Sequence, residues 1–140
     1  MTTPYLRLTL AVLLVTLGAC DGRHGLAPDT MTITIVGTND VHGELLPSEG
    51  RGGLATISGY ANALRAAHAE NNDEVLLIDA GDMWQGTLES NLSEGAAMVQ
   101  AYNAMGYAAA AIGNHEFEYG HEIFAWQKNR APFPVLAVVT

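Results

Sequence analysis

The sequence is poor in cysteine and in positive charge. One cysteine among 140 residues cannot form an internal disulfide framework or a cysteine-based zinc module. Six Lys and Arg residues stand against 15 Asp and Glu residues, giving a net charge of −9, which makes a nucleic-acid polymer a poor partner. A negatively charged ligand would need positive charge from another source, and bound metal ions could supply it.

The N-terminal apolar run is too short to span a bilayer. Leu8–Leu17 would rise about 15 Å as a helix, roughly half the thickness of the hydrocarbon core. The basic residue Arg7 precedes this run and small residues follow it, an order that is typical of a secretory signal. A buried N-terminal helix is the alternative interpretation.

The end of this run also resembles the lipobox of bacterial lipoproteins, in which a cysteine becomes the diacylated N-terminus. Leu17-Gly18-Ala19-Cys20 places the single cysteine of the chain at that position. We therefore predict a signal peptide at 1–19, a lipidated Cys20 with a polar tether at 20–30, and a domain at 31–140. The protein would be exported to the cell envelope, lipid-anchored or periplasmic or extracellular, with membrane contact only through the lipid. An ordinary signal peptide with an incidental Cys20 remains possible.

Strand and helix patterns alternate along the rest of the chain. The resulting βαβαβαβ order predicts an α/β fold with a largely parallel sheet and right-handed crossovers. The second strand is an unbroken apolar run, which is typical of a strand covered on both faces. The expected strands are Met31–Val36, Val75–Ile78, Tyr107–Ile112 and Val135–Val139; the expected helices contain Leu54, Ile57, Ala61, Leu64 and Ala67 on one face, then Ser93–Met105 with Ser93 as cap, then His121–Asn129.

Three polar clusters follow successive strands: Asn39–His42, Asp79–Asp82 and Asn114–Glu116. Gly37–Gly43 as a whole is too polar to continue the first strand. Ligands of parallel sheets bind beyond the carboxyl ends of the strands, so the clusters are predicted to share one edge and one site.

The residue types in these clusters suit a divalent-metal site. Asp40 and His42 would point the same way if their segment is extended. The carboxylate of Asp82 could bridge two ions about 4 Å apart. Each cluster alone is equally compatible with turn or capping roles, and Asn114 with an Asx turn beside an exposed His115.

Taken together, the clusters resemble the calcineurin-like metallophosphoesterase superfamily, whose motifs are DxH, GD, and GNH followed by an acidic residue. The flanking residues resemble its bacterial 5′-nucleotidase branch, and the resemblance covers roughly residues 32–136. The segments that carry it are TNDVHG at 38–43, LLIDAGDMWQGT at 76–87, NAMGYAAAAIGNHEFEYG at 103–120 and PFPVLA at 132–137.

The resemblance implies a site for two divalent ions, with Mn, Zn, Co, Fe and Mg all compatible. It assigns Asp40 and His42 to the first ion, Asp82 to both ions and Asn114 to the second. These ions would activate a water molecule that attacks a nucleotide or a related phosphate monoester.

The resemblance also implies two catalytic residues that do not bind metal directly. His115 would contact the phosphoryl oxygens or the leaving-group oxygen. An acid three residues later, usually Asp, orients this histidine in the family, and Glu118 occupies that position here.

Part of the family's site is not found in this sequence. The family has three further metal-binding histidines beyond the PFPVL segment, whereas no histidine follows His121. The chain is therefore expected to form the βαβαβαβ half of the αββα sandwich, with the second sheet absent and a C-terminal region missing. An inactive truncated lipoprotein without catalytic role, or a related hydrolase of cyclic-nucleotide or sulfur esters, are the alternatives.

Overall fold

The computed structural model describes residues 30–137 except 49, 70 and 72. The chain divides into two units, Met1–Thr30 and Met31–Thr140, and the second unit carries the fold. The predicted signal peptide, Cys20 and the tether up to residue 29 lie outside the described residues. Within the described part of the chain, no helix has the length and apolar character needed to cross a membrane.

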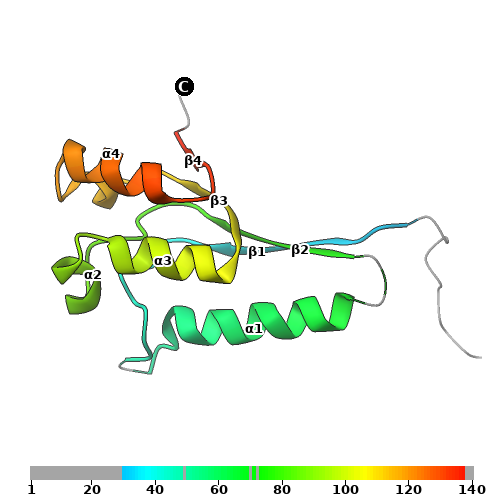
Figure 1. Cartoon of the computed structure of the whole chain (residues 1–140). Helices are drawn as coiled ribbons and strands as arrows, with labels where there is room; N and C mark the ends of the chain where they lie inside the picture. Colours follow the sequence, from blue (N-terminus) through cyan, green and yellow to red (C-terminus); the bar gives the residue numbers. More distant parts are fainter. Residues whose placement is uncertain (1–29, 49, 70, 72, 138–140) are drawn as a thin grey trace, which may run out of the picture. The chain divides into compact units, whose positions relative to one another are not determined.

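Four parallel strands form a single sheet in the order β1-β2-β3-β4 (Figure 1), which confirms the predicted α/β fold. β1 runs two residues further than the sequence predicted, because Gly37 and Thr38 pair with Ile78 and Asp79 of β2 despite their low apolarity. The strands are β1 Ile33–Thr38, β2 Glu74–Asp79, β3 Tyr107–Ala111 and β4 Val135–Leu136.

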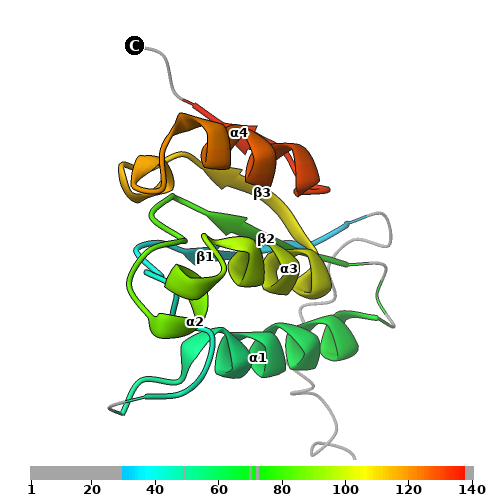
Figure 2. The same cartoon turned by 60° about the vertical axis from the view of Figure 1, so that its left-hand side comes forward.

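The helices connect successive strands and follow one another in the same order. Figure 1 and Figure 2 both show α3 between α1 and α4. The first and last of the three agree closely with the sequence prediction, although Ala67 in α1 is exposed. The elements are α1 Gly53–His68, α2 Leu88–Leu92, α3 Ala96–Met105, the 3₁₀ turn η1 His115–Phe117 and α4 His121–Arg130.

The helix predicted from Ser93 to Met105 was wrong at its N-terminal end. Glu94 and Gly95 both have left-handed backbones, with φ of 49° and 82°, so the chain turns there and α3 begins only at Ala96. Ser93 instead ends the short helix α2. Its hydroxyl oxygen still accepts the N–H of Ala97 at 3.1 Å, so Ser93 binds the start of α3 from outside the helix.

The sheet is covered on one face only, so the prediction that the second strand is covered on both faces was wrong. Val75 and Leu77 are buried, whereas Ile78 is 39% exposed and Ile35 on β1 is 62% exposed. Crossovers of one hand between strands in sequential order place all helices on the same face. The other face therefore presents apolar side chains, as expected for a sandwich half without its second sheet.

The core lies between this covered face and the helices. Tyr102 of α3 stacks on Tyr107 of β3 with ring centroids 4.0 Å apart, and both rings are buried. Truncating a fully buried residue such as Leu77 to Ala costs about 2–5 kcal/mol, so this one layer carries much of the stability. The core side chains are Leu54, Ala61, Val75, Leu77, Met83, Trp84, Met98, Val99, Tyr102, Met105, Tyr107, Ala110 and Phe133.

Candidate metal centre

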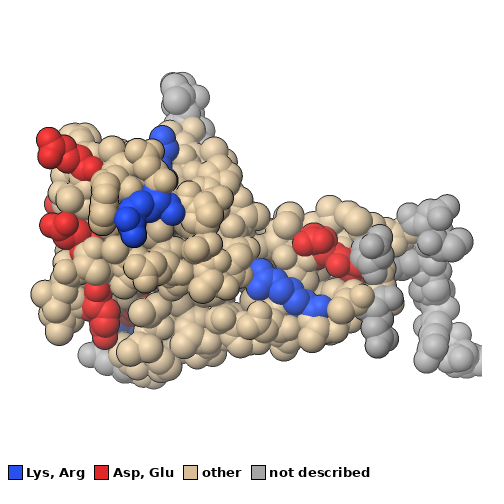
Figure 3. Space-filling model, viewed as in Figure 1, with Lys and Arg blue, Asp and Glu red and all other residues tan. Residues whose placement is uncertain are grey.

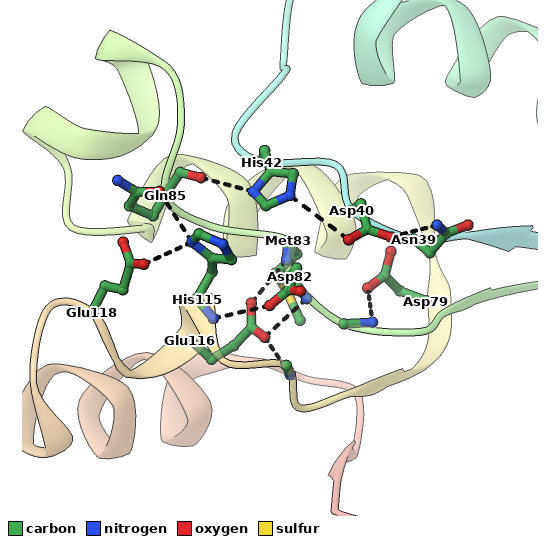
Figure 4. A network of polar contacts seen from close by, with 12 residues as sticks. Asn39, Asp40, His42, Asp79, Asp82, Met83, Gln85, His115, Glu116 and Glu118 are labelled. Atoms are coloured by element: carbon green, nitrogen blue, oxygen red, sulfur yellow. Dashed lines mark hydrogen bonds and ion pairs between the residues drawn. The ribbon is translucent and has the colours of Figure 1, made fainter.

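The side chains of Asp40, His42 and Asp82 lie near one another (Figure 4), because backbone hydrogen bonds join the loop after β1 to the loop after β2. The N–H of Asp40 donates to the carbonyl of Gly81 at 3.1 Å, and the N–H of His42 donates to the carbonyl of Asp82 at 3.0 Å. These bonds continue the β1–β2 pairing beyond the strands. They bring the first two predicted clusters together at the carboxyl edge of the sheet.

Three of the predicted metal-binding residues have left-handed backbones. The φ angles are 49° at Asp40, 47° at His42 and 57° at Asp82. The expectation that an extended segment aligns Asp40 with His42 was therefore wrong. Their side chains nevertheless converge, with His42 Nε2 3.7 Å from Asp40 Oδ1. Asp and His tolerate this conformation better than most residues, but it still costs free energy, of the order of 1 kcal/mol each.

The environment of His42 determines which ring nitrogen is available. Its Nδ1 lies 3.3 Å from the backbone carbonyl oxygen of Gln85. A carbonyl can only accept, so Nδ1 carries a proton and Nε2 is the ring nitrogen that could bind a cation. Nε2 faces the carboxylate of Asp40, and the two atoms offer a mixed nitrogen and oxygen donor pair suited to a divalent ion.

The loop after β3 completes the arrangement by touching Asp82 directly. The N–H of His115 donates to Asp82 Oδ1 at 2.9 Å. Two glycines allow this approach. A Cβ on Gly81 would lie 2.8 Å from the nitrogen of Gly113, and a Cβ on Gly113 would lie 2.6 Å from Asp82 Cγ. The third predicted cluster thus lies against the second, at the same edge.

The ring of His115 is held by two oxygen acceptors. Its Nδ1 lies 2.9 Å from Glu118 Oε1 and 3.1 Å from Gln85 Oε1, so Nδ1 carries a proton. Glu118 reaches the ring although it is one methylene longer than the Asp usual in the family. The His115 ring meets the His42 ring edge to face, with centroids 4.5 Å apart. The His115–Glu118 pair therefore lies beside the Asp40–His42 pair.

A buried carboxyl supports the loop after β2 from below. Asp79 accepts the N–H of Gly81 at 2.8 Å and the hydroxyls of Thr38 and Tyr102 at 2.5 and 2.8 Å. Burial raises the pKa of Asp79, and these hydrogen bonds oppose that shift without cancelling it. Burial, together with the nearby Asp79 charge, also raises the pKa of the Tyr102 hydroxyl. The end of β2 is thereby fixed before the chain enters the loop that carries Asp82.

The donor atoms at this edge are of the types that divalent cations bind, but they are too few to complete the coordination of an ion. Asp40, His42 and Asp82 supply carboxylate and imidazole donors (Figure 4). Asn114, immediately before His115, is exposed. Among the residues that the structure describes, no group of three or more His, Cys, Asp or Glu side chains is close enough to hold an ion as it stands. On the face drawn in Figure 3, acidic side chains gather at the end toward which the strands run, which favours cations there.

A pocket of about 420 Å³ opens beside Asp40, between the end of β1 and the start of α1. Among the described residues that line it, Arg51 is the only Arg or Lys, and its guanidinium pairs with Glu44 at 2.5 Å. His42 and Asp82 do not line it. The pocket therefore adjoins the candidate centre on one side without enclosing it.

Sequence reasoning missed Gln85, which contacts both histidines, and Asn39, whose amide nitrogen donates to Asp40 Oδ2 at 2.5 Å. Asn39 lies in the polar cluster Asn39–His42, so the sequence indicated that it would be near the site but not that it would bind Asp40. Gln85 acts partly through its backbone carbonyl, which no residue pattern reveals.

Comparisons with known proteins show which family this chain is similar to. A family model described as calcineurin-like phosphoesterase matches residues 33–139. The silent protein UshA(0) of Salmonella typhimurium strain LT2 is 38% identical over 108 residues, which are 76% of this chain and 20% of that protein. A 5′-nucleotidase of Vibrio vulnificus is 33% identical over 131 residues, which are 91% of this chain and 24% of that protein.

A solved structure shows the same arrangement of strands and helices. The 5′-nucleotidase precursor of Thermus thermophilus superimposes with a TM-score of 0.62 at 35% identity, covering 74% of this chain and 21% of that one. The matched part of the chain thus spans between a fifth and a quarter of the length of these three proteins.

Proposed function

The chain belongs to the calcineurin-like phosphoesterase family, and on that premise we propose that it forms part of an exported phosphoesterase acting on nucleotides or related phosphate monoesters. The observation that carries the proposal is the meeting of three loops at one sheet edge, which brings Asp40, His42, Asp82 and His115 together. Export rests on the apolar N-terminal run and the small residues before Cys20.

Members of this family use divalent metal ions. In the proposed site Asp40 and His42 would hold one ion, Asn114 would hold a second, and Asp82 would contribute to both. Two such ions, when bound, would supply positive charge to the phosphoryl oxygens and acidify the attacking water. The residues of this chain supply the rest: the hydrogen bond from the His115 N–H fixes one carboxylate oxygen of Asp82, and the Gln85 carbonyl fixes the orientation of His42.

In this proposal His115 stabilises the negative charge that develops on the leaving-group oxygen. Its Nδ1 is bound by Glu118, which fixes the orientation of the ring. A proton on Nε2 could then be donated to a phosphoryl or leaving-group oxygen. Glu118 therefore acts through His115 and does not itself touch the substrate.

Four donor residues leave most coordination positions of two ions to water. The isolated chain is therefore expected to bind metal weakly and to hydrolyse phosphate esters feebly or not at all. The relatives are about four times as long as this chain, so further donors and the substrate-specific contacts would come from sequence beyond these 140 residues.

The test combines metal binding with turnover in the purified full chain. Co²⁺ and Mn²⁺ are titrated by calorimetry, and hydrolysis of a chromogenic phosphate ester and of a nucleoside monophosphate is measured with each metal. We expect weak binding that falls at least tenfold in Asp82→Ala and is unchanged in Glu89→Ala, an exposed acid on α2.

Binding that is the same in Asp82→Ala as in the unaltered chain would contradict the proposed ligand set. Rapid metal-dependent turnover that disappears in Asp82→Ala would support the site and would show that the 140 residues need no further donors.

A further inference from the structure

Glu116 is a fully buried carboxylate with an unusual set of partners. Its side chain is 0% exposed. Oε2 accepts the backbone N–H groups of Gly113 at 2.6 Å and Asp82 at 3.0 Å, and Oε1 accepts that of Met83 at 2.8 Å. All three partners are backbone groups, and Figure 4 shows them converging on the carboxylate.

These bonds join two loops that are far apart in the sequence. Asp82 and Met83 follow β2, whereas Gly113 follows β3. No Lys or Arg of the described residues forms an ion pair with Glu116, so the three N–H groups carry the stabilisation of its charge. Hydrogen bonds to an ionised acceptor are about twice as strong as neutral ones. The three bonds from Asp82, Met83 and Gly113 to Glu116, which we call the junction, therefore resist separation of the two loops.

Asp82 is held both at its backbone, by the junction, and at its side chain, by His115. Its N–H is bound by Glu116, and its Oδ1 is bound by the N–H of His115. Its backbone is left-handed, a conformation that persists only where the surroundings impose it. Glu116 supplies one of the few contacts that can impose it.

We infer that Glu116 is a positioning residue that sets the place of the Asp82 carboxylate for metal binding, acting through the backbone of Asp82, Met83 and Gly113. The inference rests on the proposed function, because it concerns metal binding by Asp82. Glu116 touches neither substrate nor metal in this assignment. Its effect is on the affinity and the geometry of the site.

Glu116→Gln tests the inference with almost no change in side-chain volume. The amide retains one oxygen, but its NH₂ group is a donor and would face at least one backbone N–H that now meets an acceptor. We expect Co²⁺ affinity to fall about 10- to 100-fold, as is usual when a residue supporting a metal ligand is lost. The visible absorption spectrum of bound Co²⁺ should also change, which a merely structural role far from the ion would not cause.

Two further variants calibrate this result. Glu122→Gln removes an exposed charge in the first turn of α4 and should leave Co²⁺ binding and its spectrum unchanged. Glu116→Asp keeps the charge, so it should restore part of the affinity despite its shorter reach. Equal affinity and an identical spectrum in Glu116→Gln and the unaltered chain would overturn the inference.

Failure of the proposed function would look different, since the unaltered chain would then bind no Co²⁺ at all. Should Glu116→Gln not fold, amide NMR of the unaltered chain decides. The N–H protons of Asp82, Met83 and Gly113 should exchange slowly with solvent and should shift together when Zn²⁺ is added. Exchange as fast as in an exposed loop, or no shift with Zn²⁺, would overturn the inference.

Discussion

Replacing Gly113 by Ala probes the closest contact between two loops of the candidate centre. The added Cβ would lie 2.6 Å from both Cγ and the backbone nitrogen of Asp82, and closer still to Oδ1. Ordinary contacts of a Cβ begin at 3.4 Å, so the Asp82 carboxylate must move by about 1 Å. The backbone of Asp82 is bound by Glu116, which leaves the loop little freedom to yield.

This displacement should lower both the free energy of unfolding and the affinity for metal. Overpacking costs about 1–3 kcal/mol, and the reduced freedom of the unfolded chain returns about 0.4–1 kcal/mol. A net loss near 1–2 kcal/mol corresponds to a decrease in Tm of about 4–8 °C for a domain of this size. Metal affinity should fall about 10- to 100-fold, since a ligand is displaced.

The assay pairs thermal unfolding by circular dichroism with Co²⁺ titration. Gly59→Ala is the matched control, because a Cβ there meets nothing within 4 Å and Gly59 lies inside α1. Alanine in a helix interior should stabilise by about 0.5–1 kcal/mol and leave Co²⁺ affinity unchanged. If Gly113→Ala keeps both the Tm and the affinity of the unaltered chain, the reasoning from the loop contact is refuted.

Three further predictions concern other parts of the chain. Mass spectrometry of the exported protein should find Cys20 at the N-terminus with a diacylglyceryl group, and an unmodified N-terminus at Asp21 would contradict lipidation. Burial raises the pKa of Asp79, so the stability contributed by its protonated form is fully present below pH 3.8 and is lost as the pH rises through the raised value. Relative to the unaltered chain, Asp79→Asn should therefore gain unfolding free energy as the pH rises above 3.8 in denaturant titrations, and a relative loss would oppose this assignment. Ile35→Lys, on the uncovered sheet face, should reduce self-association in sedimentation analysis without lowering Tm, whereas unchanged association would show that this face is not involved.

The fold was largely predictable because its main signals are local. The apolar spacing of α1 and the apolar run of β2 directly reflect burial against one layer. The break between α2 and α3 was not predictable, because it depends on the left-handed pair Glu94 and Gly95. A Cβ on Gly95 would lie 2.9 Å from the buried Trp84 ring, so that turn is fixed by a tertiary contact.

The open sheet face shows a different limit of sequence reasoning. An apolar run in a strand indicates apolar neighbours but does not say whether they are present on both sides. Leu77 and Ile78 are equally apolar, yet Leu77 is 0% and Ile78 39% exposed. The order of the strands decides this difference, and that order is a property of the whole sheet.

The position of the three polar clusters at one sheet edge was predictable, but the backbone conformation that brings them together was not. Spacing after successive strands placed Asp40, His42 and Asp82 at one edge, and the structure brings them there. The backbone that achieves it is left-handed at all three positions, which the sequence did not indicate. The contacts that hold it come from Gln85 and Glu116, and Glu116 is more than 30 residues away from Asp82 along the chain.

The free-energy cost of the left-handed backbones is offset by hydrogen bonds within the protein. Asp40 and His42 donate to the loop after β2, and Asp82 is bound by both Glu116 and His115. Because these contacts already fix the loops, a cation that binds there need not order them, and its binding free energy is reduced less by lost chain entropy. Weak metal binding by this chain would then reflect too few donors and not a flexible site. Adding donors should strengthen binding, whereas rigidifying the loops further should not.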